Sequence, residues 1–271
     1  MKKILKAANG NVLITGNPGT GKTEFSHSVL DQKFYSRAVI HQEKKDEYIT
    51  QKQDMLFNPY SEKGYVWDFM SESEETKKMF LNAMNDENVN ELLKLMAHKM
   101  QNPKQKSFVL KDFFAKKNQT KLILCNESEH RQTLISLFSA FIACMNHVQI
   151  SMQDTKTDIT LYVLEDFLNL INEMNEQSQN NLFKLRAKGG ILIPIMQYMP
   201  KDKKIQQLLT GSAYTWIYFS NYDANTRKML EDSIGGEKVN ELFKEMGAFE
   251  HITYISDEQA AYTSCKKQVW L

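Results

Sequence analysis

Eight consecutive residues near the start of the chain have the types and the spacing of a phosphate-binding loop. They match the pattern Gly-x-x-x-x-Gly-Lys-Ser/Thr in full and read Gly16-Asn17-Pro18-Gly19-Thr20-Gly21-Lys22-Thr23. Glycines let the backbone turn its N–H groups toward a phosphate, the lysine reaches the β- and γ-phosphates of a nucleotide, and the Thr23 hydroxyl coordinates Mg²⁺. The pattern predicts a site for ATP and Mg²⁺, and a glycine-rich turn that matches by chance is the alternative.

A pair of carboxylates follows an apolar segment much later in the chain. Glu165 and Asp166 come directly after Leu161-Tyr162-Val163-Leu164. A nucleotide site of this kind uses one carboxylate in the shell of the magnesium ion and another to activate water. We assign Glu165 to the metal shell and Asp166 to the water, with the reverse order and an acidic helix cap as alternatives.

Two further polar residues lie beyond the acidic pair. Arg186 is a candidate arginine finger, which would stabilise the transition state in a neighbouring subunit, and a solvated arginine at a helix end is the more ordinary interpretation. Gln197 follows an apolar segment and is a candidate sensor of the γ-phosphate, with a surface glutamine as the alternative. The predicted catalytic set is therefore Lys22, Glu165, Asp166, Arg186 and Gln197.

These residues need strands and helices that bring them to one edge of a sheet. Residues 11–15 are a short β-branched run before the loop, and residues 20–30 read as the helix after it. Further strands are predicted at 38–40, 121–125, 159–164, 190–195 and 215–220. Strands that alternate with helices indicate an α/β fold with a mostly parallel sheet, which binds ligands at the carboxyl ends of its strands.

A helical segment interrupts this alternation. Apolar residues at helical spacing between Glu72 and Met100 predict two or three helices that end near Asn102-Pro103. Residues 54–59 are expected to form an irregular loop before them. We therefore predict the first part of a nucleotide-binding domain at 1–66, an all-α insert domain at 67–118 and the second part of the nucleotide-binding domain at 119–271.

Composition and charge exclude some classes of protein. With 42% hydrophobic residues, the 271-residue chain is unlike a disordered protein. Lys+Arg 34 against Asp+Glu 33 gives a net charge of +1, so any contact with DNA would come from local groups of lysines. The candidates, with solvated loops as the more ordinary interpretation, are Lys99, Lys104, Lys106, Lys111, Lys116, Lys117, Lys121, Lys201, Lys203 and Lys204.

Cysteine usage and apolar segments predict a cytoplasmic location. Cys125, Cys144 and Cys265 are far apart and lack the spacing of a zinc site or a disulfide framework. The basic N-terminus is not followed by the apolar core of a signal peptide. The most apolar stretch, from Leu134 to Met145, is about a dozen residues long, shorter than the roughly 20 that cross a bilayer.

Taken in order, these motifs resemble the conjugative coupling proteins of the TraD/TraG group, which belong to the FtsK/HerA-like, RecA-fold motor ATPases. Besides the Walker A loop, the matching segments are 54–59 with 67–69, 108–114, 164–167 as Walker B, Arg186, Gln197, and 221–226 with 234–235. The acidic pair departs from the family's pattern because it reads Glu-Asp rather than Asp-Glu. Because the chain begins 15 residues before Gly16, we expect a short form without the N-terminal membrane segment that members usually carry.

The resemblance implies a RecA-like P-loop NTPase that couples ATP hydrolysis, stimulated by DNA, to DNA translocation or delivery to a type IV secretion system. It implies a homo-oligomer, usually a hexamer, in which Arg186 completes the adjacent active site. Relaxosome or secretion-channel proteins would be partners that recruit the cytoplasmic chain to the inner face of the membrane. The alternative function is a nucleotide-gated adaptor that binds ATP with little turnover and recruits a protein partner.

Overall fold

The chain folds into two compact units. The first contains Met1–Gln32 and Ile193–Leu271, and the second contains Lys33–Leu192. The structure, a computed structural model, describes residues 10–42, 48–62, 64–84, 89–126, 129–220, 223–246, 250–255 and 260–263. Cys265 and the pair Asn221-Tyr222 of the last family segment lie outside the described residues.

The first unit is built on strands in the order β11-β10-β9-β1-β8. β1 (Asn11–Thr15) pairs in parallel with both β8 (Gly190–Met196) and β9 (Ala213–Phe219). β10 (His251–Ile255) runs antiparallel to β9, and β11 (Ala260–Thr263) runs antiparallel to β10. The three parallel strands therefore end at one edge, where the glycine-rich loop begins.

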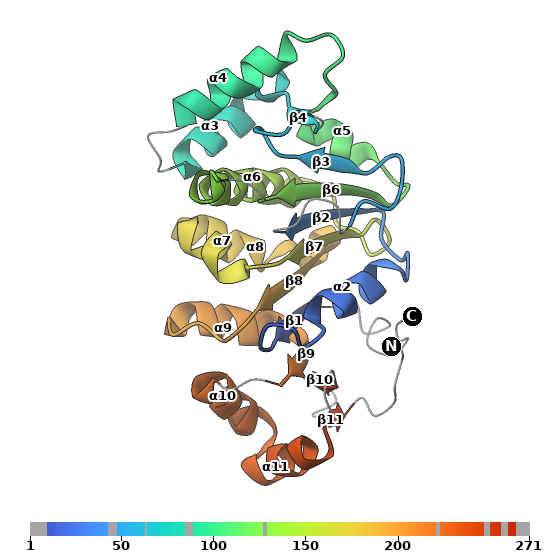
Figure 1. Ribbon diagram of the computed structural model, residues 1–271, viewed down its shortest axis with the longest axis vertical. Helices are drawn as coiled ribbons and strands as arrows, with labels where there is room; N and C mark the ends of the chain where they lie inside the picture. Colours follow the sequence, from blue (N-terminus) through green and yellow to red (C-terminus); the bar gives the residue numbers. More distant parts are fainter. Residues whose placement is uncertain are drawn as a thin grey trace. The chain divides into compact units, whose positions relative to one another are not determined.

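The described residues of the first unit form the helices α2 (Lys22–Leu30), α9 (Lys203–Ser212), α10 (Ala224–Ile234) and α11 (Gly236–Glu245) (Figure 1). Aspartates begin two of them. Asp202 accepts hydrogen bonds from the backbone N–H groups of Lys204 and Ile205, and Asp223 accepts one from Thr226. An N-cap of this type stabilises a helix by about 1 kcal/mol, which explains why α9 and α10 start at these residues.

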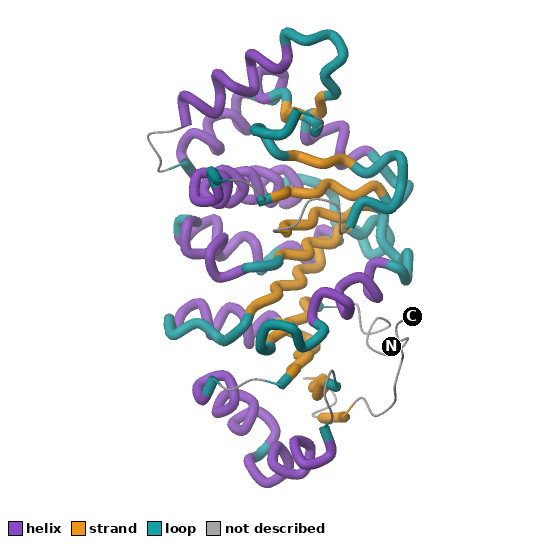
Figure 2. The backbone as a smooth tube through the Cα atoms, in the orientation of Figure 1, coloured by secondary structure: helices purple, strands orange, loops and turns teal. Residues whose placement is uncertain are grey.

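The second unit contains a parallel sheet in the order β7-β2-β6-β3 (Figure 2). Its strands are β7 (Thr160–Leu164), β2 (Arg37–Gln42), β6 (Thr120–Cys125) and β3 (Met55–Phe57). The expected irregular loop at 54–59 is wrong for its middle, because Met55 and Phe57 are buried in β3. The expectation of a mostly parallel α/β fold is confirmed in both units.

The predicted helical insert also lies in the second unit. Its elements are η1 (Phe69–Ser71), α3 (Glu74–Ala83), α4 (Val89–Met100) and α5 (Leu110–Ala115). It is not helical throughout, because β4 (Val66–Trp67) pairs in parallel with β5 (Ser107–Phe108) at its two ends. The division at 66/67 and 118/119 stays a prediction, since the structure groups the insert with residues 33–192.

An apolar helix, α6 (Arg131–Ile150), forms much of the core of the second unit. It packs against α3, against α7 (Phe167–Glu173) and against α8 (Glu176–Leu182). The ring of Phe141 on α6 lies 5.3 Å from Phe57 and 4.9 Å from Trp67, measured between ring centroids. Each large side chain buried in this way contributes roughly 1.5–3 kcal/mol, so the sheet and the insert share one core.

This helix is longer than the apolar stretch in the sequence suggests. At 20 residues, α6 is long and apolar enough by composition to cross a membrane, but 72% of its most apolar window is buried inside the protein. A core helix meets the same test of length and composition as a membrane span. The burial of α6 is that of a core helix.

Candidate phosphate-binding site

The glycine-rich loop adopts a conformation that depends on glycine at three positions. Gly19 and Gly21 have φ angles of 73° and 96°, in the left-handed region that other residues rarely adopt. Gly16 has no room for a side chain, because an added Cβ would lie 2.5 Å from the Cβ of Phe219. The chain can therefore pass closely over the end of β9 and turn into α2.

The start of α2 carries the two residues that the motif assigns to phosphate and metal. The Nζ of Lys22 donates hydrogen bonds to the carbonyl oxygens of Gly16 and Asn17, over 2.9 and 2.7 Å. Gly21, the N-cap of α2, provides no side-chain cap for the helix. Backbone N–H groups, the helix dipole and a lysine ammonium therefore meet at this loop, an arrangement that binds phosphate.

Backbone hydrogen bonds hold the loop to the two neighbouring parallel strands. Gly16 N–H donates to the carbonyl oxygen of Met196 over 3.2 Å, and Asn17 N–H donates to that of Ser220 over 3.0 Å. Gln197 comes directly after Met196 and is exposed. The structure therefore brings the predicted γ-phosphate sensor to the loop in the first unit.

An aromatic cluster that the sequence did not reveal supports the loop from the helix side. The ring of His251 on β10 lies 5.2 Å from Phe25 on α2 and 5.0 Å from Phe219 on β9. Burial lowers the pKa of His251 to about 4, so this imidazole is neutral near pH 7. His251 therefore packs in this cluster as a neutral ring.

In the second unit, the acidic pair follows β7 as expected, and His41 fixes the backbone of Glu165. Glu165 N–H donates to the carbonyl oxygen of His41 over 3.1 Å. In return, Nδ1 of His41 lies 2.7 Å from the carbonyl oxygen of Glu165. Burial lowers the pKa of His41 to about 4. The neutral ring must carry its proton on Nδ1 to donate this bond.

The two carboxylates have different surroundings. Oε1 of Glu165 accepts a hydrogen bond from the hydroxyl of Tyr48 over 2.9 Å. Oδ2 of Asp166 accepts from Arg131 over 3.0 Å and from Asn169 over 2.6 Å, at the start of α7. Asp166 also has a φ of 52°, which is uncommon outside glycine. Asp166 is the N-cap residue of α7 but makes no side-chain cap to the helix backbone, and the water-activating role assigned to it stays a prediction.

Arg186 lies in the second unit, in η2 (Leu185–Lys188), and its side chain is exposed. Over the part of the chain that the structure describes, its guanidinium forms no hydrogen bond or ion pair. The structure thus groups the loop with Gln197 in the first unit, and Glu165 with Asp166 in the second. Tyr48 and His41 were missed, because no local pattern in the sequence links them to Glu165.

The donors in this chain suit Mg²⁺ that is bound mainly through phosphate and water. Mg²⁺ prefers oxygen ligands and usually keeps several waters, with one or two protein oxygens beside the substrate phosphates. The Thr23 hydroxyl and the Glu165 carboxylate are oxygen donors of this kind. Among the described residues, no group of three or more His, Cys, Asp and Glu side chains could hold a metal ion on its own.

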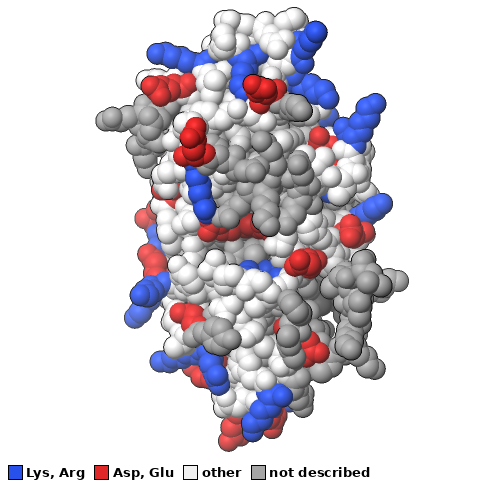
Figure 3. All heavy atoms as spheres, in the orientation of Figure 1, with Lys and Arg blue, Asp and Glu red and all other residues white. Residues whose placement is uncertain are grey.

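The lysines proposed for DNA contact have mixed surroundings. The prediction that Lys121 contacts DNA is wrong, because this lysine is buried. Its Nζ donates to the carbonyl oxygen of Tyr48 and to Oγ1 of Thr50. Lys104, Lys106 and Lys111 are exposed. On the face drawn in Figure 3, basic side chains lie in separate groups among acidic ones. The described surface on that face carries no single continuous basic patch.

Comparison with known proteins decides the family. The model of the type IV secretion-system coupling protein DNA-binding domain matches residues 4–91 and 74–255. The chain belongs to this family. No curated protein sequence matches the chain of this coupling-protein domain.

Solved structures confirm the fold. Plasmid coupling protein TrwB in complex with ADP and Mg²⁺ has 15% sequence identity and a TM-score of 0.63, over 97% of this chain and 84% of TrwB. TrwB with the ATP analogue ADPNP has 14% identity and a TM-score of 0.62, over 95% and 78%. The genome packaging NTPase B204 from Sulfolobus turreted icosahedral virus 2, with AMPPCP, has 10% identity and a TM-score of 0.50, over 94% and 96%.

Proposed function

We propose that this coupling-protein domain is an ATPase that couples ATP binding and hydrolysis to the movement of DNA, or to its delivery to a type IV secretion system. The observation that carries the proposal is the loop before α2, where the Lys22 ammonium lies on the carbonyl oxygens of Gly16 and Asn17. Membership of the coupling-protein family supports the connection to DNA transfer. The TrwB structures with ADP, Mg²⁺ and ADPNP support ATP and Mg²⁺ as ligands.

In this proposal, each predicted residue has one role in phosphoryl transfer. The loop N–H groups and Lys22 bind the phosphates, and Thr23 and Glu165 serve as oxygen ligands in the Mg²⁺ shell. When bound, Mg²⁺ supplies positive charge that offsets the charge developing on the phosphate oxygens. Asp166 orients the attacking water, and Gln197 contacts the γ-phosphate.

Arg186 requires a second copy of the chain. We propose that it stabilises the transition state in a neighbouring subunit of a homo-oligomer, a hexamer by analogy with the family. Its guanidinium is exposed and has no hydrogen bond or ion pair among the described residues, which supports this role. Relaxosome or secretion-channel proteins remain proposed partners, as does a cytoplasmic location at the inner face of the membrane.

The test is the rate of ATP hydrolysis with and without DNA. Wild type should hydrolyse ATP faster with DNA. Lys22→Ala should reduce the rate by about a hundredfold or more, since it removes the positive charge that stabilises the transferred phosphate. Lys238→Ala is the matched control, because Lys238 is exposed on α11 and pairs with Glu241. An absence of hydrolysis in wild type under all conditions would overturn the proposal. ATP binding without turnover would support the adaptor instead.

A further inference from the structure

Tyr48 contacts the carboxylate of Glu165 from a distant part of the sequence. Its hydroxyl donates to Oε1 over 2.9 Å, although the two residues are 117 positions apart. The Tyr48 side chain is completely buried. A buried donor of this kind favours one orientation of the carboxylate, because a hydrogen bond has a preferred distance and angle.

The segment after Tyr48 is anchored to β6 by a buried ion pair. Nζ of Lys121 donates to the carbonyl oxygen of Tyr48 over 3.0 Å and to Oγ1 of Thr50 over 2.6 Å. Oδ2 of Asp54 accepts from the backbone N–H groups of Thr50 and Gln51, both over 2.9 Å. Lys121 and Asp54 are themselves 3.8 Å apart, with 6% and 0% of their side chains exposed.

These contacts fix Glu165 at two levels. His41 holds its backbone through both the N–H and the carbonyl group. That leaves the side-chain torsions of Glu165, and the Tyr48 hydroxyl restrains them through Oε1. A long glutamate side chain loses rotamer freedom when it is held in one geometry. Because the hydrogen bond to Tyr48 is already formed, this rotamer freedom is lost on folding and not on ligand binding.

We propose that Tyr48 is the positioning residue of this site: it orients the Glu165 carboxylate for its role toward Mg²⁺ and the nucleotide. The inference rests on the proposed function, since it requires Glu165 to act in nucleotide chemistry. Residues that orient a metal ligand through a hydrogen bond are typically worth 10–100-fold in metal affinity or activity. In this proposal Tyr48 acts through Glu165, as a positioning residue.

The variant Tyr48→Phe tests this, because it keeps the buried ring and removes only the hydroxyl. We expect the Mg²⁺ concentration that gives half-maximal ATP hydrolysis to rise about tenfold, while nucleotide affinity in the presence of EDTA stays at the wild-type value. Tyr162→Phe is the matched control. Its hydroxyl is equally buried and donates to Oε1 of Gln149 over 2.6 Å, so it should lose similar stability without a change in Mg²⁺ dependence.

A second pair of variants separates positioning from loss of folding. Thr50→Val leaves Tyr48 intact but removes the bond between Lys121 and Oγ1 of Thr50, so it should shift Mg²⁺ dependence in the same direction by a smaller factor. The double variant is compared with Glu165→Ala alone, and the measured quantity is Mg²⁺-dependent ADP binding. Adding Tyr48→Phe to Glu165→Ala should not change this binding further. Such a double-variant cycle isolates the interaction between the two residues.

The outcomes separate this inference from the proposed function. If wild type neither binds nor hydrolyses nucleotide, the proposed function fails. If wild type is active and Lys22→Ala is not, while folded Tyr48→Phe keeps the wild-type Mg²⁺ dependence, only the role of Tyr48 is overturned. An equal effect of Tyr48→Phe with and without Glu165 would also overturn it.

Discussion

The indole N–H of Trp67 donates a hydrogen bond to Oε1 of Glu72 over 2.7 Å, and both side chains are buried. The same oxygen accepts from the backbone N–H of Leu110 over 2.5 Å. Glu72 thus joins residues from the beginning and the end of the helical insert. Burial raises the pKa of Glu72, although the two hydrogen bonds oppose that shift.

This arrangement predicts a pH-dependent stability. Because the folded protein has the higher Glu72 pKa, it binds more protons than the unfolded chain above about pH 4.5, the ordinary value for this group. The contribution of Glu72 to the free energy of unfolding should therefore fall as the pH rises from 4.5 through the raised pKa. Urea unfolding from pH 4 to 8 should show this slope in wild type and not in Glu72→Gln. The exposed Glu74→Gln should keep the slope, and parallel curves for wild type and Glu72→Gln would contradict the prediction.

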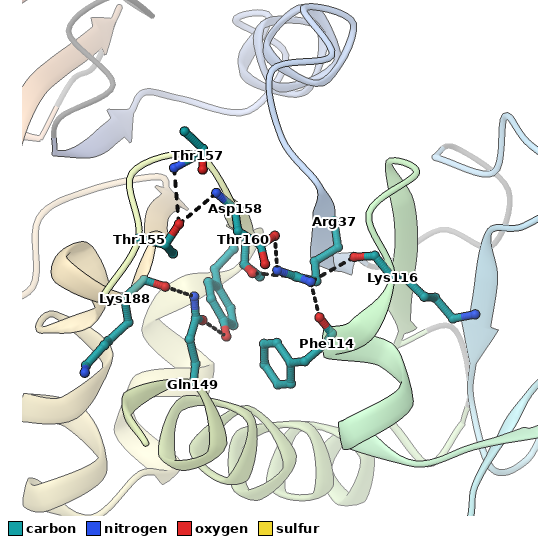
Figure 4. A network of polar contacts seen from close by, with 10 residues as sticks. Arg37, Phe114, Lys116, Gln149, Thr155, Thr157, Asp158, Thr160 and Lys188 are labelled. Carbon is teal, nitrogen blue, oxygen red and sulfur yellow. Dashed lines mark hydrogen bonds and ion pairs between the residues drawn. The ribbon is translucent and has the colours of Figure 1, made fainter. Parts of the chain in front are cut away.

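Arg37 should be essential for stability rather than for chemistry. Its guanidinium is buried, pairs with Asp158 and donates to the carbonyl oxygens of Phe114 and Lys116 (Figure 4). Arg37→Met leaves these acceptors unsatisfied, so we expect a loss of roughly 3 kcal/mol in the free energy of unfolding. Arg227→Met, which breaks an exposed pair with Glu231, should cost about 1 kcal/mol or less. Equal losses in denaturant titrations would show that the buried network of Arg37 contributes no more to stability than the exposed pair of Arg227.

Two glycines should respond in opposite ways to the same substitution. Gly16→Ala places a Cβ within 2.5 Å of Phe219, so the loop must move and nucleotide affinity should fall at least tenfold. Gly211 lies in α9 with open space around it. Gly211→Ala should raise the free energy of unfolding by about 0.5–1 kcal/mol and leave nucleotide binding unchanged. Calorimetric titration with ADP and thermal unfolding measure both effects, and wild-type affinity of Gly16→Ala would refute the role of the close approach.

If Arg186 acts in a neighbouring subunit, two inactive variants should complement each other. Arg186→Ala should lower the rate of ATP hydrolysis by about a thousandfold while nucleotide affinity stays the same. A mixture of Arg186→Ala and Lys22→Ala chains should recover activity, because the second supplies the arginine to the intact loop of the first. As a control, a mixture of Arg186→Ala with Lys238→Ala chains gives the activity expected when the partner chain is unimpaired. No recovery in mixed oligomers, verified by native mass measurement, would place Arg186 outside the reaction.

The parts of the fold predicted from the sequence are those encoded by adjacent residues. The loop at 16–23, β1 and the strand before Glu165 each occupy one continuous segment with a clear apolar pattern. β3 was missed because three residues are too few for a periodic signal. The sequence predicts the core helix at roughly 129–145, and α6 continues to Ile150 because polar residues such as Gln149 end the apolar run before the helix ends.

Side-chain relationships across the chain could not be predicted in this way. Nothing near Tyr48 in the sequence indicates a bond to Glu165, since the parallel pairing of β2 with β7 brings the two segments together only in the folded unit. Lys121 shows the reverse problem. As one lysine among several it resembled a surface contact, but its place on β6 opposite Ala38 buries it beside Asp54.

The short pairing of β4 with β5 allows the length of the insert to vary. Val66 lies opposite Ser107, and Trp67 lies opposite Phe108, so the chain leaves and returns at adjacent points. The length of the segment between β4 and β5 therefore does not determine how β3 pairs with β6. Residues can be added or removed near α4 without shifting the register of the sheet. Within the insert, α3 packs against α6 and shares the core of the unit, so the segment around α4 is where a change in length leaves the sheet in place.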